Sequence, residues 1–159
     1  MPNAQQFEDW SGTDRLLVVF DGCCPFCHAS VGWLLRRDRR DRLRFAASES
    51  PHAVALLSSV ADRIQDAVPM ESGNPGTIIV LAPASKAMPQ RVLLRSEAVL
   101  ACMGELSPPW PQLAALVRLI PRPIRDRAYR AVASLRYRLA PRLDACPLPP
   151  PEFRHRFLD

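Results

Sequence analysis

The sequence has little lysine and no hydrophobic run long enough to cross a membrane. Lys86 is the single lysine among 21 basic residues, and the formal net charge is +5. A genome rich in G and C raises arginine and proline together, and the chain has 17 prolines, so this bias gives no reason to expect nucleic-acid binding. Residues 1–6 lack the basic and apolar pattern of an export signal, and no segment approaches the roughly 18 apolar residues of a membrane span. We therefore expect a cytoplasmic protein.

Short apolar runs alternate with helical spacing over about the first hundred residues. Strands are expected at 16–20, 43–46, 77–81 and 91–95. Helices are expected from about residue 27, over 51–66 after a cap at Ser50, and over 96–104 after a cap at Ser96. Parallel strands need crossover helices, whereas the last two strands are joined by a loop and can pair antiparallel. The order βαβαββα therefore predicts an α/β, thioredoxin-like, three-layer domain.

The rest of the chain changes character after Pro108. We expect an N-terminal arm over 1–14, the thioredoxin-like domain over 15–106, a helical appendage over 107–142 that packs on it, and a proline-rich tail over 143–159 that runs over the surface. Apolar residues at helical spacing predict that the appendage buries a stripe on the domain. These residues are Leu113, Leu116, Val117, Ile120, Leu135 and Leu139.

The appendage is also rich in arginine. A solvated helix face explains this pattern, and a binding face for anionic lipid or an acidic partner is the alternative. The arginines are Arg118, Arg122, Arg125, Arg127, Arg130, Arg136 and Arg138.

The close pair Cys24 and Cys27 lies where the first strand passes into the first helix. Disulfide exchange needs one thiol that ionises near neutral pH and a second thiol close enough to resolve the mixed disulfide. The helix N-terminus is expected to stabilise the thiolate of Cys24, so Cys24 is the predicted nucleophile. Cys27, one turn further in and more buried, is the predicted resolving thiol. Pro25 fits the first helical turn, where its missing N–H costs nothing.

The segment from Phe20 to Cys27 resembles the Asp-Gly-x-Cys-x-x-Cys signature of the DCC family of predicted thiol-disulfide oxidoreductases. It includes Asp21, Gly22, Cys23 and Phe26. Further likeness lies at Arg44-Phe45, at 96–100, at 121–129, at 136–138 and at 144–147. The resemblance covers about residues 15–150 and implies a thioredoxin-like fold with Cys24 and Cys27 as the redox pair. It leaves the substrate open as a protein or small-molecule thiol or disulfide, without a cofactor.

Two departures from better-known thioredoxin-like proteins concern substrate docking. A cis-proline usually directly precedes the third strand, but here Gly76 stands before Thr77 and Pro75 lies one residue earlier. The chain also has neither a Gly-Gly pair nor Val-Pro before that strand, which weakens a glutathione-binding interpretation.

A non-enzymatic metal or haem protein is the alternative. Cys24, Cys27 and His28 satisfy the attachment motif of c-type haem, although that attachment generally occurs outside the cytosol. Zinc could recruit the same residues with Cys23 and Cys146, but structural zinc usually needs a second closely spaced pair, which is absent. We therefore expect no metal, and His28 as a first-turn helix residue that tunes Cys24.

The other residues of the motif have two interpretations each. Asp21 can accept a proton from Cys27 or can simply end the strand. Cys23 is expected to pack, although it could form a competing disulfide, and Cys102 is expected to lie in the core. Five cysteines in a reducing compartment are not expected to form a structural disulfide framework.

Overall fold

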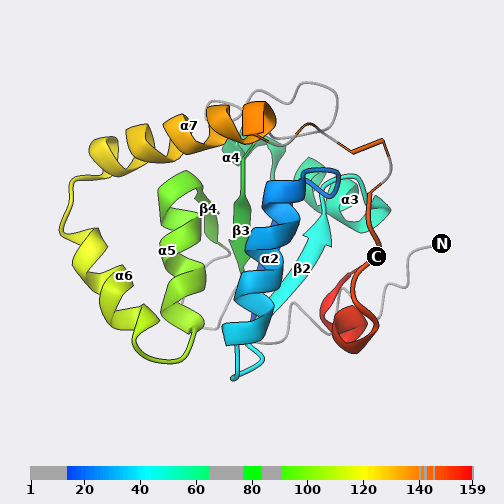
Figure 1. Ribbon diagram of the computed structural model, residues 1–159, viewed down its shortest axis with the longest axis horizontal. Helices are drawn as coiled ribbons and strands as arrows, with labels where there is room; N and C mark the ends of the chain where they lie inside the picture. The colour runs from blue at the N-terminus through cyan, green and yellow to red at the C-terminus, as the bar shows by residue number, and fades with distance from the viewer. Residues whose placement is uncertain are drawn as a thin grey trace.

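Figure 1 shows the chain as a computed structural model, in which a four-stranded sheet lies between helices. The structure describes residues 14–64, 77–83, 91–139, 141, 143, 144 and 146–158. In chain order the elements are β1 (Leu16–Phe20), α2 (Pro25–Arg37), β2 (Leu43–Ala47), α3 (Pro51–Ser59), α4 (Ala61–Ile64), β3 (Ile79–Ala82), β4 (Arg91–Leu94), α5 (Arg95–Glu105), α6 (Trp110–Arg118), α7 (Arg122–Leu139) and the 3-10 helix η1 (Pro151–Arg156).

The sheet has the order β2-β1-β3-β4, and its pairing confirms the predicted fold class. β1 and β2 are parallel, with Val18 opposite Phe45, and α2 makes the crossover between them. β3 runs antiparallel to both β1 and β4. One parallel βαβ unit followed by an antiparallel pair is the thioredoxin-like arrangement, so β1 ends and α2 begins at one edge of the sheet. That edge carries the cysteine motif.

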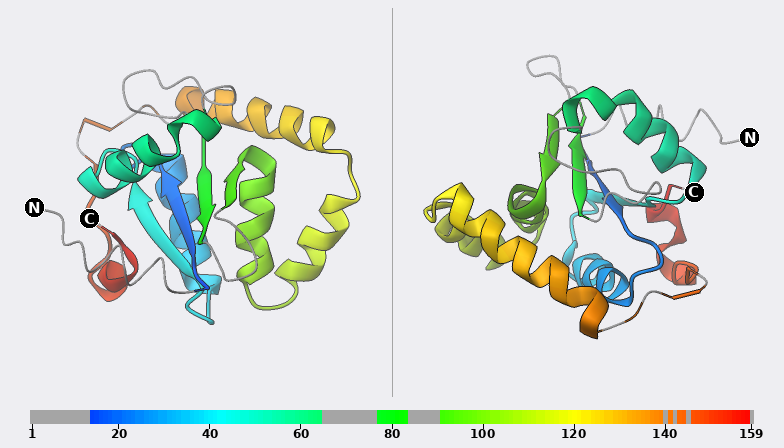
Figure 2. Two further views of the ribbon diagram at one scale, coloured as in Figure 1. Left: turned by 180° about the vertical axis from the view of Figure 1, so that it is seen from behind. Right: turned by 90° about the horizontal axis from the view of Figure 1, so that it is seen from above.

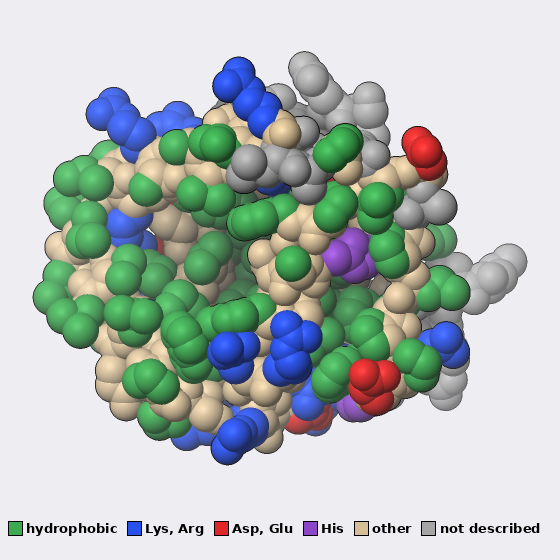
Figure 3. Space-filling model, in the orientation of Figure 1, with side chains coloured by type: hydrophobic (Ala, Val, Ile, Leu, Met, Phe, Trp, Pro, Cys, Tyr) green, Lys and Arg blue, Asp and Glu red, His purple; other side chains and the backbone are tan. Residues whose placement is uncertain are grey.

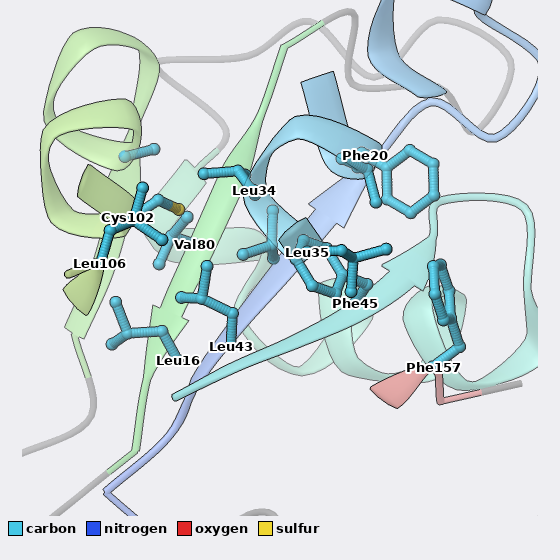
Figure 4. Close-up of a cluster of buried hydrophobic side chains, with 13 residues drawn as sticks. Leu16, Phe20, Leu34, Leu35, Leu43, Phe45, Val80, Cys102, Leu106 and Phe157 are labelled. Atoms are coloured by element: carbon cyan, nitrogen blue, oxygen red, sulfur yellow. The ribbon is translucent and has the colours of Figure 1, made fainter. Parts of the chain in front are cut away.

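Alternation along β1 divides the core between the two faces of the sheet. Leu17 and Val19 pack on the side of α3, whereas Leu16, Val18 and Phe20 pack on the side of α2 and α5. Figure 4 shows the second cluster, and Figure 2 shows α3 and α4 on the opposite side of the sheet from α2 and α5. The result is three layers, as predicted.

The first local difference from the expectations lies in the helix after β2. The predicted helix over 51–66 is interrupted at Val60, and its residues 65 and 66 lie outside the described residues. The face of α3 that packs on the core carries Ala53, Leu56 and Leu57.

β3 starts at Ile79, two residues later than predicted. The backbone N–H of Ile78 and the hydroxyl of Thr77 donate to the hydroxyl oxygen of Tyr129 on α7, each at 3.0 Å, so these two residues bond to the appendage. Pro75 and Gly76, the candidate positions for a cis-proline, lie outside the described residues.

Helices α6 and α7 pack against α5, but most of the apolar stripe expected to hold them is exposed. Val117 is half-buried, and the side chain of Leu139 is not among those that the structure describes. Leu113, Leu116, Ile120 and Leu135 are exposed, Leu116 to 63%. The buried contact of α6 is Ala114 instead, because a nine-residue helix on the rim of the molecule covers only a narrow face. No helix in the described parts of the chain is long and apolar enough to cross a membrane.

Polar contacts attach α7 to the domain. The backbone N–H and the hydroxyl of Ser96 donate to Asp126. Ser96 does not cap α5 as predicted, because α5 begins at Arg95 and the cap position is Leu94. Several arginines of the predicted solvated face also form ion pairs within the protein. Arg125 lies 3.2 Å from Glu97. Arg118 and Arg122 pair with Glu97 and Asp126.

The proline-rich tail was predicted to run over the surface, but its last described residues are buried. Residues 146–148 are exposed, but Phe157 and Leu158 are buried, and the N–H of Leu158 donates to the carbonyl of Phe45 at 2.8 Å. Arg156 reaches the fully buried carboxylate of Asp38 at 3.1 Å. The end of the chain therefore packs beside β2, with Phe157 in the core on the side of α2 and Leu158 in the core on the side of α3.

Candidate active site

A four-residue turn joins β1 to α2 and carries the motif. The N–H of Cys24 donates to the carbonyl of Asp21 at 3.3 Å, and the N–H of Cys23 donates to the carboxylate of Asp21 at 3.1 Å. The N–H of Gly22 donates to Glu49 at 3.1 Å. A Cβ on Gly22 would lie 2.9 Å from the Cβ of Ala47, so the close approach of the turn to the end of β2 requires glycine.

Cys24 caps helix α2 with its own sulfur, as its position in the sequence predicts. The Sγ atom accepts the N–H of Cys27 at 3.3 Å, and Pro25 occupies the first helical turn. This N–H is one of the unpaired donors of a helix N-terminus, and it favours negative charge on the sulfur that it contacts. Neither Cys24 nor Cys27 forms a disulfide in the structure.

The relative burial of the two cysteines is the reverse of what was predicted. Cys24 is 0% exposed, whereas Cys27 is partly exposed. The cause is tertiary, because the turn lies between the end of β2 and the C-terminal segment, while the first turn of α2 faces an open hollow.

Several groups set the protonation of Cys27. Burial raises its pKa to about 12, and the hydrogen bond and charge of the Cys24 sulfur add to this effect. The guanidinium of Arg136 opposes the shift; its Nη1 atom lies 3.5 Å from the Cys27 sulfur. The buried carboxylate of Asp21 raises the pKa further. Cys27 is therefore a thiol, not a thiolate, at neutral pH.

A hollow of about 710 Å³ opens beside Cys27. Its walls come from α2, α5, α6 and α7 and are mainly apolar. They include Phe26, Trp33, Val99, Met103, Trp110 and Val132. Figure 3 shows the hollow below α7, with hydrophobic side chains around it. Cys27 and Arg136 also line it, so a molecule in the hollow would meet a thiol and a cation together.

The two tryptophans of the hollow join α2 to α6. The rings of Trp33 and Trp110 meet edge to face with centroids 4.6 Å apart, and Arg37 stacks over Trp33 at 4.3 Å. Cys102 also lines the hollow, but it belongs to the core, as predicted, and burial raises its pKa to about 12. It is therefore a poor candidate for a reactive thiol.

Cys23 forms a disulfide with Cys146, where packing was expected. The two Cα atoms are 4.3 Å apart across a sequence separation of 123 residues. The N–H of Leu143 donates to the carbonyl of Cys23 at 2.9 Å, so the C-terminal segment runs directly past the motif. Cys23 is buried and Cys146 is exposed. The expectation that the cysteines form no such bridge is wrong, because the tail returns to the motif.

His28 points at the backbone of the motif. Its Nε2 atom contacts the carbonyl oxygen of Gly22, and its ring lies edge-on to Phe20 with centroids 5.5 Å apart. Among the described residues, one group of three could hold a metal ion by distance: Cys23, Glu49 and Cys146. Its two cysteines are bonded to each other here, and the set considered for the metal-binding alternative, Cys24, Cys27 and His28, does not form such a group.

Sequence reasoning missed Arg136, Glu49 and the apolar hollow as parts of the site. Arg136 was grouped with a solvated helix face, yet it is 5% exposed. No local pattern marks one arginine of a basic helix as buried.

Comparisons with known proteins agree with the geometry. The DCC1-like thiol-disulfide oxidoreductase family matches residues 18–142, which contain the cysteine pair and Arg136. The chain is 28% identical over 145 residues to the uncharacterized protein YuxK of Bacillus subtilis, covering 89% of this chain and 93% of that protein. It is 31% identical over 137 residues to a chloroplastic DCC family protein of Arabidopsis thaliana, covering 84% of this chain and 70% of the relative. No solved structure matches the chain significantly.

Proposed function

The chain belongs to the DCC1-like thiol-disulfide oxidoreductase family, and from this membership we propose that it exchanges disulfides through Cys24 and Cys27. When the protein is oxidised, its dithiol and a substrate disulfide give the Cys24–Cys27 disulfide and two substrate thiols. Two electrons pass to the substrate with two protons. The reverse reaction oxidises a substrate dithiol.

One observation carries the proposal: two free sulfur atoms lie within one helical turn, with the first at the helix N-terminus. The N–H of Cys27 favours negative charge on the Cys24 sulfur, whereas burial raises the pKa of Cys27, so we assign the attack to Cys24. Cys24 is thus the nucleophile, and Cys27 is the thiol that closes the disulfide. Thiolate character is what thiol–disulfide exchange requires.

The surroundings of Cys27 support a role for two further groups. Asp21 is buried and close enough to raise the pKa of Cys27, which suits a proton acceptor for this thiol. Arg136 contacts the same sulfur and stabilises the charge that develops when the proton leaves. The hollow gives a substrate thiol or disulfide with an apolar flank a route to Cys27.

Thiol mapping with a small disulfide tests the proposal. Fully reduced protein is mixed with hydroxyethyl disulfide, quenched with acid and mapped by mass spectrometry for the Cys24–Cys27 bond. Because Cys23 and Cys146 would also consume the reagent, both are replaced by serine in the proteins compared. In that background Cys24→Ser is expected to slow the release of the second thiol from each hydroxyethyl disulfide by roughly a thousandfold or more, since Cys27 alone cannot close a disulfide. Cys102→Ser in the same background is the matched control and should keep the rate of the parent protein. Equal rates in Cys24→Ser and Cys102→Ser would contradict the proposal, and metal released on thiol modification would favour the metal-binding alternative.

A further inference from the structure

We propose that the Cys23–Cys146 disulfide is a second redox centre, which exchanges with the Cys24/Cys27 pair through the buried sulfur of Cys24. Disulfide bonds would then pass between the exposed surface at Cys146 and the hollow at Cys27. The inference rests on the proposed exchange activity and adds to it an internal partner for Cys24.

The burial of Cys24 is the reason for proposing this transfer of disulfides through its sulfur, which we call the relay. A sulfur that is 0% exposed reaches a disulfide in solution only when the turn moves, whereas sulfur atoms beside it inside the protein need no such opening. Cys27 donates its N–H to this sulfur, and Cys23 of the bridge directly precedes Cys24 in the chain. Cys27 and the bridge both have accessible surface, Cys27 toward the hollow and Cys146 toward solvent. The buried sulfur thus has a neighbour at each of two entry points.

The chain geometry brings Cys24 within reach of Cys146. Consecutive Cα atoms are about 3.8 Å apart, and the Cα of Cys146 lies 4.3 Å from that of Cys23, so Cys24 and Cys146 are at most about 8 Å apart. Disulfides usually join Cα atoms separated by roughly 4.4–6.8 Å. The Cα atoms of Cys24 and Cys146 therefore need to approach by no more than about 1 Å to come within that range.

The C-terminal segment is held in place without the bridge. Leu143 bonds to the backbone of Cys23, Leu158 bonds to Phe45, and Arg156 pairs with Asp38. Opening the bridge therefore leaves Cys146 beside the motif, where it can exchange again. A disulfide whose only role was to fasten the tail would duplicate these contacts.

The relay consists of two balanced exchange steps. The Cys24 thiolate attacks the sulfur of Cys146, the Cys23–Cys146 bond breaks, and Cys23 leaves as a thiolate. Cys27 then loses its proton, and the Cys23 thiolate accepts a proton in its place. The Cys27 thiolate attacks the sulfur of Cys24. The Cys24–Cys146 bond breaks, and Cys146 leaves as a thiolate. In sum, the disulfide moves from Cys23–Cys146 to Cys24–Cys27, and Cys23 and Cys146 become the dithiol.

The intermediate can be trapped by removing the resolving thiol. Cys27→Ser with its bridge oxidised is kept at neutral pH without external oxidant, quenched with acid and mapped by mass spectrometry. We expect a Cys24–Cys146 bond with free Cys23 in roughly a tenth or more of the molecules, because exchange between bonds of similar potential populates both. A Cys27→Ser protein that contains only Cys23–Cys146, with Cys24 free in every molecule, would overturn the relay.

A second measurement follows the wild-type protein and separates the two proposals. Fully reduced protein receives one equivalent of hydroxyethyl disulfide, and its bonds are mapped over time. We expect Cys23–Cys146 to form first and then to decline as Cys24–Cys27 appears. In Cys146→Ser, Cys24–Cys27 should form roughly tenfold more slowly, because the buried sulfur has lost its internal partner.

The same measurement has two contrary results. Equal rates of Cys24–Cys27 formation in wild type and Cys146→Ser would leave the proposed function standing and refute the relay. If Cys24–Cys27 never forms in the wild-type protein, the proposed function itself fails.

Discussion

The Nη1 atom of Arg136 lies 3.5 Å from the sulfur of Cys27, which precedes it by 109 residues in the chain. This contact brings the second half of α7 to the start of α2. It also puts a positive charge beside a thiol whose pKa burial raises to about 12. The helical appendage is therefore part of the site.

Arg136→Gln tests this contact. Without the guanidinium the pKa of Cys27 should rise further, so fewer molecules can close the disulfide at neutral pH. We expect closure to slow by roughly tenfold, the effect of one pKa unit. Rates of Cys24–Cys27 formation measured against pH would check this. Arg130→Gln, an exposed arginine on the same helix, is the control and should leave the profile unchanged.

Asp21→Asn tests the proton acceptor. Asparagine keeps an oxygen for the N–H of Cys23 but cannot take the proton of Cys27. We expect disulfide closure at neutral pH to slow by about 100-fold, within the usual range for a lost general base, and to recover as the pH rises. Asp144→Asn, an exposed change, should have no such effect. A loss that is the same at every pH would mean that Asp21 only shapes the turn.

The pair of Asp126 and Ser96 predicts an acid-sensitive attachment of α7. Burial alone would raise the pKa of Asp126, but the hydrogen bonds from Ser96 and the nearby Arg122 lower it below the usual range. A depressed pKa stabilises the fold above the unfolded value of about 3.9, and this stabilisation is lost as the pH falls through the folded pKa. Asp126→Asn should therefore be less stable than wild type at pH 7 by about 1.5–3 kcal/mol. In urea unfolding, the difference should shrink below about pH 4.

Two glycines give opposite predictions for substitution by alanine. Gly22→Ala places a Cβ 2.9 Å from that of Ala47, so the turn must shift, at a cost of about 1–3 kcal/mol and with slower exchange. Gly104 lies in α5, and a Cβ added there would meet open space, so Gly104→Ala should stabilise the protein by about 0.5–1 kcal/mol. Thermal unfolding of both variants measures the contrast. Equal destabilisation would contradict the packing around Gly22.

The exposed leucines of the appendage should contribute little to stability. Leu116→Gln changes a side chain that is largely in solvent, so the free energy of unfolding should change by no more than about 0.5 kcal/mol. Leu106 is fully buried at the end of α5, and Leu106→Ala should cost about 2–5 kcal/mol. Urea unfolding compares the two. A large loss for Leu116→Gln would mean that a further partner covers α6.

The sequence alone determined the elements whose causes are local. The apolar run at 16–20 forms β1, because five consecutive strand-forming residues suit a strand buried on both faces. Pro25 and the cap at Cys24 determine where α2 begins, and Ser50 caps α3 for the same reason. The order of strands and helices follows, and with it the position of the cysteine pair at the helix N-terminus.

Only the tertiary structure decided which sulfur is accessible and what surrounds it. Cys24 is buried because the turn is enclosed at the end of β2, and Cys23 is bonded because the tail returns to it from 123 residues away. Arg136 and its exposed neighbours share the same basic helix pattern, and packing alone separates them. Hydrophobic spacing shows that a face can be buried, but which residues find a partner depends on surfaces that the rest of the chain supplies. The leucines of α6 remain exposed among the described residues. Helix α7 is attached instead through polar groups of Ser96, Ile78 and Thr77, and no local sequence pattern linked these residues to α7.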